Sequence, residues 1–374
     1  MYCLLRPCFQ TSFRLASKIK LKYVCICIGL IMILDFFGAF THFLEITYDS
    51  KFVYPYEGDV HEFVNALRHN EKPDVDPINE YNYTYKIDIR QKCEDAAYSS
   101  FRVVYIVKSA LEHFERRMAI RNTWGFEKRF FDVPSRTIFV VGVHQEDNEL
   151  QAKLEMEAAK YKDIVQADFR DMYYNNTIKT MISFKWLVKY CQNSKFYMFV
   201  DDDMYVSVRN VLRFIRNPAN YPDYLKEPKK IGAHKREIKD SDKTEELDVR
   251  LFAGFVFVSS PHRHKSSKWY VSLSEYPYHL WPTYITTGAY ILSKEALLEM
   301  YYTSMYTKHF RFDDIFLGLV AKKADIEPFH CEEFHFYKKD YTKFNYKYVI
   351  TSHGYGNPNE LLNVWNEQKA LGNA

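Results

Sequence analysis

The chain has 374 residues, of which 47% are hydrophobic and 17% aromatic, and its formal net charge is +3. This apolar content excludes a disordered protein, and the small net charge gives no reason to expect nucleic-acid binding. The length is sufficient for an anchor with one large domain, or for two modest domains.

The first predicted element is an apolar segment at 23–43, which is long enough to cross a bilayer as a helix. Asp35 lies inside it at a cost of about 2.5–3.5 kcal/mol near the bilayer centre, which the flanking apolar residues can offset. Basic residues without an acid precede the segment and acidic residues follow it, which predicts a cytoplasmic amino terminus and a lumenal remainder. A cleaved signal peptide is the alternative, but no small-residue cleavage site follows.

The region after the apolar segment has little periodicity and recurring prolines among charges, which indicates a stem or spacer. Asn82 and Asn175 begin glycosylation sequons, which are usable only in a lumenal chain and support that topology weakly because sequons also arise by chance. The predicted organisation is a cytoplasmic tail at 1–22, a transmembrane signal anchor at 23–43, a stem at 44–98 and one large domain at 99–374.

Three of the seven cysteines lie beyond the predicted anchor: Cys93, Cys191 and Cys331. Their odd number permits one disulfide with one thiol left over, and the sequence does not determine which pair forms. No C-x-x-C or H-E-x-x-H zinc signature is present.

Strand and helix patterns alternate along the large domain, which favours an α/β fold with a mainly parallel sheet and helices on both faces. A charged stretch at 222–250 interrupts the alternation and is interpreted as a surface excursion. Asp147 and Ser293 are predicted helix caps. The expected strands cover 102–107, 137–143, 164–165, 196–200, 251–258 and 288–293, and the expected helices cover 150–161, 177–190, 295–301 and 360–369.

The buried strand at 196–200 runs directly into Asp201, Asp202 and Asp203. Carboxylates at the carboxyl end of a central strand lie where open α/β sheets bind ligands. Three adjacent acids repel one another unless a cation is shared, and carboxylate oxygens suit Mn²⁺ or Mg²⁺. A solvated acidic turn is the alternative. An EF-hand is disfavoured because Val206 stands where its loop needs glycine.

Three basic residues are candidate phosphate contacts. Arg117 and Arg121 stand four apart, so on a helix they share a face that suits a diphosphate. A solvated face, whose arginine side chains pair with Glu112 or Glu115, is the alternative. Lys179 lies near the start of the predicted buried helix, where it either reaches a phosphate or extends to solvent.

Asp313 and Asp314 form a second acid pair between apolar residues. Desolvation and the neighbouring charge should raise the pKa of such a carboxyl, as a general base requires. A helix N-terminus capped by Asp313 is the alternative. His353 lies in a glycine-containing loop, where a lone histidine is more often a surface residue than a ligand.

Aromatic residues in irregular chain precede a strand that contains glycine. Trp281 and Tyr284 near Gly288 are what a sugar-stacking wall would need, although such residues more often belong to a core.

Six blocks of the large domain carry a shared pattern: RRMAIRNTWG at 116–125, DFRDMYYNNTIKT at 168–180, FVDDDMYV at 199–206, KWY at 268–270, WPTY at 281–284 with GAYILS at 288–293, and FDDIFLG at 312–318. In order and spacing they resemble the beta-1,3-galactosyltransferase family of Golgi enzymes, which includes beta-1,3-N-acetylglucosaminyltransferases and has fringe-type relatives. The resemblance covers nearly everything from Phe101 to Trp365.

The resemblance implies a GT-A fold with a Rossmann-like sheet, a UDP-sugar donor, Mn²⁺ or Mg²⁺, and transfer with inversion to a 3-hydroxyl of a glycan on a glycoprotein or glycolipid. It also implies a single-pass type II protein of the Golgi membrane. In the implied site Asp201 and Asp202 face the ribose side of the nucleotide, Asp203 and His353 bind the metal, and Asp314 is the base. The remaining predicted contacts are Arg117, Arg121 and Lys179 to the nucleotide and Trp281, Tyr284, Gly288 and Asp313 to the sugars.

The chain departs from the family pattern in places that affect specificity. Asp313 stands where the family usually has glutamate, and Thr287 and Ala289 flank Gly288 where the family is richer in glycine. The donor sugar (Gal, GlcNAc or GalNAc) and the acceptor therefore stay open. A non-catalytic lumenal protein that binds UDP or glycans and kept the fold is the alternative function, and a glycosidase is a weaker third.

Overall fold

The computed structural model describes residues 20–48, 52–53, 59–94, 100–129, 133–144, 147–222, 224 and 250–374. The chain divides into two compact units, Met1–Phe52 with Ser259–Trp281 and Val53–Val258 with Pro282–Ala374. The charged stretch predicted at 222–250 lies almost entirely outside the described residues.

The first unit contains helix α2 (Leu21–Phe36), which has 16 residues and no buried side chain. Among the described residues, no helix combines the length and the apolar character needed to span a membrane. The transmembrane helix predicted at 23–43 is therefore not confirmed. The loop at 259–281 is fastened within this unit by Arg263, which donates to Glu45 Oε1 over 2.7 Å and to Val271 O over 2.8 Å.

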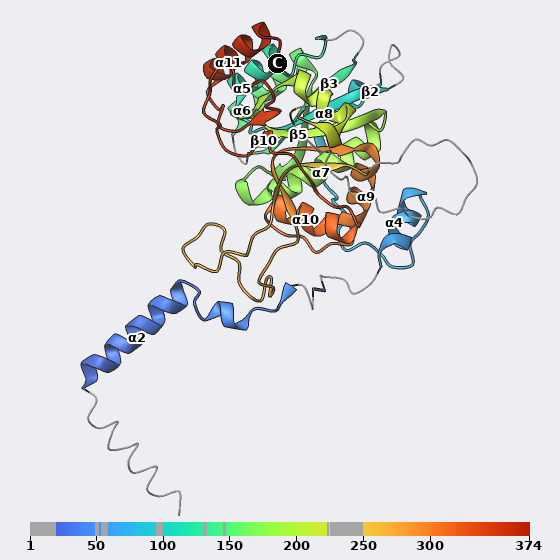
Figure 1. Cartoon of the computed structure of the whole chain (residues 1–374). Helices are drawn as coiled ribbons and strands as arrows, with labels where there is room; N and C mark the ends of the chain where they lie inside the picture. The colour runs from blue at the N-terminus through green and yellow to red at the C-terminus, as the bar shows by residue number, and fades with distance from the viewer. Residues whose placement is uncertain are drawn as a thin grey trace, which may run out of the picture. The chain divides into compact units, whose positions relative to one another are not determined.

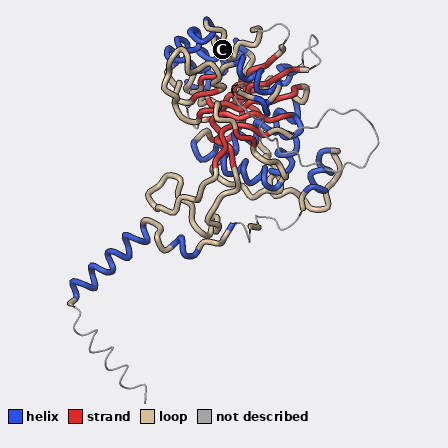
Figure 2. The backbone as a smooth tube through the Cα atoms, viewed as in Figure 1, coloured by secondary structure: helices blue, strands red, loops and turns tan. Residues whose placement is uncertain are grey.

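The second unit is built on an eight-stranded sheet in the order β1-β4-β3-β2-β5-β8-β7-β9. Four of its seven pairings in the described residues are parallel: β4–β3, β3–β2, β2–β5 and β7–β9. These pairings confirm the predicted α/β fold with a mostly parallel sheet. Figure 2 shows the strands gathered at the centre of this unit, with helices around them. The strands are β1 (Tyr85–Ile87), β2 (Phe101–Lys108), β3 (Ser135–Val143), β4 (Ile164–Arg170), β5 (Ser194–Asp201), β7 (Phe252–Phe257), β8 (Tyr284–Ser293) and β9 (Phe329–His330).

A smaller sheet in the order β10-β11-β6 lies in the same unit, from β10 (Phe334–His335), β11 (Thr351–Ser352) and β6 (Tyr205–Val206). The caps predicted at Asp147 and Ser293 are confirmed, because their side chains accept from Leu150 N and Ala296 N. The helices are α4 (His61–Arg68), α5 (Phe114–Asn122), α6 (Asn148–Tyr161), α7 (Asn176–Tyr190), α8 (Val208–Arg216), α9 (Lys294–Ser304), α10 (Asp313–Lys323) and α11 (Pro358–Ala370).

Helices cover both faces of the large sheet because its central strand is apolar on both sides. Phe199 of β5 packs on Phe184 of α7 with ring centroids 4.9 Å apart. Its neighbours Met198 and Val200 point to the opposite face and join a core cluster with Ile120 of α5. Figure 1 accordingly places α7, α9 and α10 on one side of the sheet and α5, α6 and α11 on the other.

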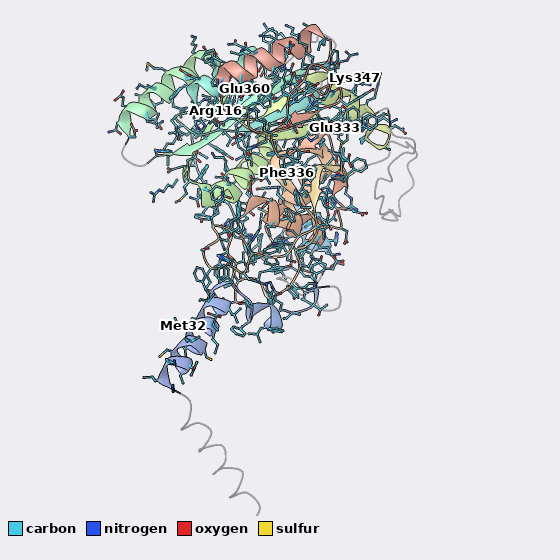
Figure 3. All side chains as sticks on the ribbon, turned by 60° about the vertical axis from the view of Figure 1, so that its left-hand side comes forward. Met32, Arg116, Glu333, Phe336, Lys347 and Glu360 are labelled. Atoms are coloured by element: carbon cyan, nitrogen blue, oxygen red, sulfur yellow. A yellow bond between two sulfur atoms is a disulfide. The ribbon has the colours of Figure 1, made fainter. Side chains whose placement is uncertain are left out.

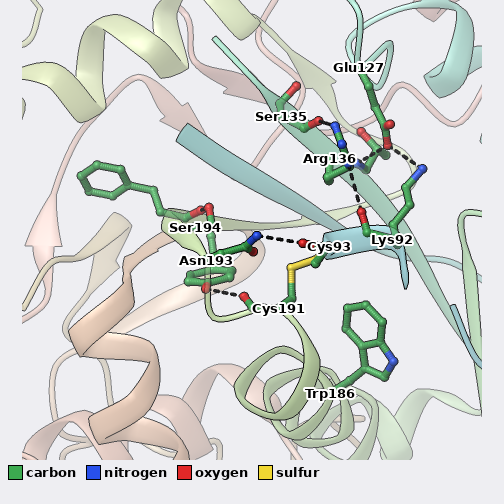
Figure 4. Close-up of a disulfide and its surroundings, with 12 residues drawn as sticks. Lys92, Cys93, Glu127, Ser135, Arg136, Trp186, Cys191, Asn193 and Ser194 are labelled. Atoms are coloured by element: carbon green, nitrogen blue, oxygen red, sulfur yellow. Dashed lines mark hydrogen bonds and ion pairs between the residues drawn. A yellow bond between two sulfur atoms is a disulfide. The ribbon is translucent and has the colours of Figure 1, made fainter. Parts of the chain in front are cut away.

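Residues 59–94, which the sequence predicts as part of a spacer, belong to the second unit and contact its other elements. Arg68 of α4 donates to Glu299 of α9 over 3.0 Å, and β1 pairs with β4. A disulfide joins Cys93 to Cys191, and Asn193 Nδ2 donates to Cys93 O over 2.7 Å (Figure 4). This is the pairing that the sequence left open, and Cys331 is buried and is not part of this disulfide.

Candidate active site

The centre of the candidate site is Lys108, the last residue of β2. β2 and β5 are adjacent and parallel, so Lys108 lies beside Asp201 at the same edge of the sheet. Its Nζ is 3.1 Å from Asp201 Oδ1 and 3.0 Å from Asp313 Oδ2. Burial alone would lower the pKa of Lys108, but the charges of Asp201 and Asp313 raise it above its ordinary value. The buried ammonium group of Lys108 therefore connects the acid turn, which is formed by Asp201, Asp202 and Asp203 at the end of β5, to the start of α10.

Asp313 is a buried anchor for α10. Thr287 of β8 donates to its Oδ1 over 3.0 Å, and Thr180 of α7 donates to its Oδ2 over 3.4 Å, beside Lys108. The helix N-cap is Phe312, so the alternative that Asp313 caps the helix is not what the structure has. Its two oxygens are engaged by protein donors.

Asp314 is the next residue of α10 and has a different environment. Burial, followed by the charge of Asp313, raises the pKa of Asp314 to about 7. Its Oδ1 accepts from Ile315 N over 2.8 Å. A half-buried carboxyl of this kind exchanges a proton near neutral pH, which is the property that general-base chemistry needs.

The three adjacent aspartates at the end of β5, Asp201, Asp202 and Asp203, have three different environments. Asp201 is 37% exposed in its side chain, and burial together with the charges of Asp203 and Asp313 raises its pKa to about 6. Asp202 is buried. Burial would raise the pKa of Asp202, but hydrogen bonds, led by that from His113, lower it.

The bonds to Asp202 tie the acid turn to the connection between β2 and α5. Ser109 Oγ donates to Asp202 Oδ2 over 2.6 Å, and His113 Nδ1 is 2.8 Å from the same oxygen. Arg116 donates to Asp202 Oδ1 over 3.0 Å. Asp202 was predicted to face the ribose, yet both of its oxygens already have protein partners.

Asp203 and His353 lie together, as their predicted role as metal ligands requires. His353 Nε2 is 3.2 Å from Asp203 Oδ2, and this bond raises the pKa of His353. The other oxygen, Asp203 Oδ1, is buried and has no hydrogen-bond partner. Burying a carboxylate oxygen without a partner is costly, and a hard divalent cation would supply the missing contact.

The described residues contain no cluster of three or more His, Cys, Asp or Glu side chains that could hold a metal. Asp203 and His353 would thus supply two ligands. This fits Mg²⁺ or Mn²⁺ sites that are completed by substrate phosphates and water.

Gly288 of β8 faces the acid turn. A Cβ built on Gly288 would lie 3.8 Å from both Asp201 Oδ2 and Met204 Sδ. The glycine therefore leaves room for about one methyl group beside the carboxylate of Asp201. Its predicted position near a substrate stays a prediction.

The aromatic wall was predicted from Trp281 and Tyr284. Tyr284 is 9% exposed, stacks on Phe257 with centroids 5.9 Å apart, and closes over Gly318 of α10. Trp281 belongs to the first unit, where it is 4% exposed and packs on Tyr276 with centroids 4.0 Å apart. Packing partners cover the rings of both residues, so their predicted role as sugar-stacking surfaces is corrected to a packing role.

Arg117 and Arg121 do not reach the site, because both turn towards α6. Arg117 is fully buried, and its N–H groups all donate within the protein, to Glu157 Oε1 and Oε2, Ser109 Oγ, and the carbonyl oxygens of Ala110 and Leu111. Arg121 donates to Glu157 and to both oxygens of Asp163. The predicted diphosphate contact is corrected to a structural one, and the acidic partners of both arginines lie on and just after α6 rather than at Glu112 or Glu115.

Lys179 is neither solvent-exposed nor open to a ligand. Its Nζ lies 2.7 Å from Asp171 Oδ1 and donates to Ser109 O over 2.8 Å, and its side chain is 5% exposed. It supports the segment that carries Ser109, beside Asp202.

Sequence reasoning missed Lys108, His113 and Arg116 as site residues. The sequence does contain a signal for Lys108. One apolar strand ends in the basic residue Lys108, and another ends in the acidic residue Asp201. It becomes readable only once β2 and β5 are known to be neighbours. His113 is the N-cap of α5 and Arg116 lies in its first turn, and the orientation of this helix depends on tertiary packing.

Comparison with known proteins identifies relatives over most of the chain. Residues 115–332 match the Galactosyltransferase family model. Beta-1,3-galactosyltransferase brn of Drosophila melanogaster is 38% identical over 355 residues, which cover 93% of this chain and 96% of that protein. Human Beta-1,3-galactosyltransferase 1 is 29% identical over 294 residues, covering 79% of this chain and 81% of the human protein. Lactosylceramide 1,3-N-acetyl-beta-D-glucosaminyltransferase B of Danio rerio is 28% identical over 351 residues, covering 91% and 83%.

Proposed function

The chain belongs to the beta-1,3-galactosyltransferase family, and from this premise we propose that it transfers a hexose from a UDP-sugar to a 3-hydroxyl of an acceptor glycan, in a metal-dependent reaction. The observation that carries the proposal is the position of Lys108. By contacting both Asp201 and Asp313, it brings the acid turn and the start of α10 into one site. A transferase of this type needs its nucleotide-binding residues and its general base within reach of the same donor sugar.

Asp203 and His353 are the proposed ligands of Mn²⁺ or Mg²⁺. When bound, the ion would neutralise charge on the diphosphate of the donor and so stabilise the departing UDP. Asp201 has the most exposed side chain of the three adjacent aspartates. It also borders the space left by Gly288. We assign this space to the donor, on the side of its ribose and sugar.

Asp314 is the proposed general base. It takes the proton of the acceptor 3-hydroxyl as that oxygen bonds to the anomeric carbon of the donor. The bond from this carbon to the UDP oxygen breaks at the same time, and its electron pair leaves with UDP. One displacement inverts the anomeric configuration, so no enzyme nucleophile is required. The pKa of about 7 leaves a substantial fraction of Asp314 ionised at neutral pH.

We also propose that the protein is a type II protein of the Golgi membrane, anchored through residues 23–43. The segment is apolar, several basic residues and no acid precede it, and none of the side chains of α2 is buried. Protease treatment of intact microsomes should leave the region after residue 43 protected. Digestion of that region without detergent would contradict the topology.

The activity is tested with the purified protein, Mn²⁺, and a panel of UDP-Gal, UDP-GlcNAc and UDP-GalNAc, scored by UDP release with and without simple acceptors. We expect acceptor-dependent release from one of these donors and loss of release when the metal is chelated. UDP binding without turnover against every acceptor would contradict catalysis and favour a non-catalytic binding protein.

A further inference from the structure

The loop from His353 to Gly356 carries one of the two proposed cation ligands and connects β11 to α11. Its start is fixed by the ladder in which Ser352 of β11 pairs with Tyr205 of β6. Beyond this ladder, Tyr355 N donates to Asp203 O over 2.7 Å. The loop is therefore already aligned with the acid turn at its beginning and middle.

The end of the loop is held by a side chain from a third segment. Arg116 of α5 donates from Nε to Gly356 O over 3.1 Å and from Nη1 to Asp202 Oδ1 over 3.0 Å. The same guanidinium thus contacts the loop that bears His353 and the turn that bears Asp203. Figure 3 labels Arg116 of α5 and Glu360, which lies in the first turn of α11, the helix that follows this loop.

Asp202 can hold the guanidinium firmly because its other oxygen is fixed separately. Ser109 Oγ and His113 Nδ1 both contact Asp202 Oδ2, which leaves Oδ1 to Arg116. Bonds from a charged donor to a carboxylate are among the strong ones. The buried carboxylate of Asp202 and the guanidinium of Arg116 thus connect the acid turn, α5 and the loop from His353 to Gly356.

Gly356 shows how closely the guanidinium and the loop approach each other. A Cβ built on Gly356 would lie 2.8 Å from Arg116 Nη2 and 3.1 Å from Arg116 Cζ. Any side chain there would push the guanidinium aside. A glycine at this position is therefore a condition for the contact with Gly356 O.

We propose that Arg116, seated against Gly356, is a positioning residue that sets the distance between His353 and Asp203 and so tunes the affinity of the site for a divalent cation. This inference rests on the proposed function, because it assumes that these two residues hold the cation. Partners that orient metal ligands typically affect metal affinity by about 10- to 100-fold. In this proposal Arg116 acts through its bonds to Gly356 O and Asp202 Oδ1, and not as a ligand of the cation.

Two variants break the contact from opposite sides. Arg116→Lys keeps the positive charge but cannot reach Asp202 and Gly356 O with the geometry of a guanidinium fork. Gly356→Ala leaves Arg116 unchanged and displaces its flexible end. Arg136→Lys is the matched control, since Arg136 donates to the carbonyl oxygens of Lys92 and Ser135 at the other end of the sheet.

The readout is the dissociation constant of Mn²⁺ in the presence of saturating UDP, which allows no turnover, measured by the loss of the free Mn²⁺ signal in electron paramagnetic resonance. We expect a 10- to 100-fold weaker Mn²⁺ affinity in Arg116→Lys and in Gly356→Ala, and wild-type affinity in the control. Transfer by both variants should recover at high Mn²⁺, so that the Mn²⁺ requirement rises while kcat stays within about twofold.

The outcomes separate the two proposals. Wild-type Mn²⁺ affinity in both variants would overturn the role of Arg116 and leave the proposed function standing. A kcat that stays low at saturating Mn²⁺ would also overturn it, because the residue would then act on more than the cation site. Absence of Mn²⁺ binding by the wild-type protein with UDP would overturn the proposed function and this inference together.

Discussion

Two clusters of charged residues lie near α5, and they differ in how completely the protein neutralises them. Between α5 and α6, Arg117 and Arg121 meet Glu157 and Asp163 in buried ion pairs, and every guanidinium N–H of Arg117 has an acceptor. Charge and hydrogen-bonding capacity balance there. The cluster is suited to holding α5 against α6 and has nothing to offer a ligand.

At the carboxyl end of β5 the balance fails. Lys108 is shared by Asp201 and Asp313, and His353 contacts only one oxygen of Asp203. The other oxygen, Asp203 Oδ1, is buried without a hydrogen-bond partner, and burial followed by the charge of Asp313 raises the pKa of Asp314 to about 7. The difference between the clusters is that the candidate functional one contains carboxylates that the protein leaves partly uncompensated, which a cation and a proton could satisfy.

The largest expected effect on the second cluster follows from Asp314→Asn. Removing a general base typically costs about 10²- to 10⁴-fold in rate, so kcat should fall by this amount while UDP still binds. Transfer assays combined with UDP titration test both parts. A variant that retains the full rate would remove Asp314 from the mechanism.

The first cluster is tested with Arg117→Met. This change leaves Glu157 with a buried, partly unpaired charge, so the free energy of unfolding should fall by about 3–5 kcal/mol. Chemical denaturation measures the loss. Turnover per folded molecule should stay at the wild-type value, and a specific loss of UDP affinity would restore the diphosphate role that the sequence suggested.

The pH dependence of transfer reports the uncompensated acids. The pKa of Asp314 is raised by burial and then by Asp313, and the base works when deprotonated. Activity should therefore increase by about tenfold per pH unit below pH 7 and level off above it. In Asp313→Asn the neighbouring charge is gone, so the rising limb should move to lower pH. A limb in the same place would mean that another group titrates.

The smallest expected effect concerns the space beside Asp201. In Gly288→Ala the new methyl group makes contacts no closer than 3.8 Å, so the protein should keep its melting temperature. The methyl group would occupy room assigned to the donor and raise the donor KM by up to about 10-fold, since one such group in a pocket is worth roughly that much. An unchanged KM would place the donor elsewhere.

The sequence predicted the local parts of this architecture well because they depend on local patterns. The apolar run of β5 and its aspartates are contiguous, and the caps at Asp147 and Ser293 are confirmed. The acid pair at Asp313 and Asp314 was predicted from its apolar flanks. In the structure Lys108 contacts both Asp313 of this pair and Asp201 of the acid turn.

The features that the sequence did not reveal depend on pairing between distant segments. Arg117 and Arg121 share a helix face, but nothing local shows that α6 brings Glu157 and Asp163 to that face. The role of Lys108 requires β2 beside β5. The disulfide between Cys93 and Cys191 spans 98 residues and could not be chosen over its alternatives.

Calorimetric titration of UDP with Mn²⁺ into Asp203→Ala and Asp314→Asn tests most directly whether one site contains both a cation-dependent nucleotide contact and a separate base. The account predicts that UDP binding is lost in Asp203→Ala and retained in Asp314→Asn, although neither variant turns over. Retention of Mn²⁺-dependent UDP binding in Asp203→Ala, or equal loss in both variants, would contradict it.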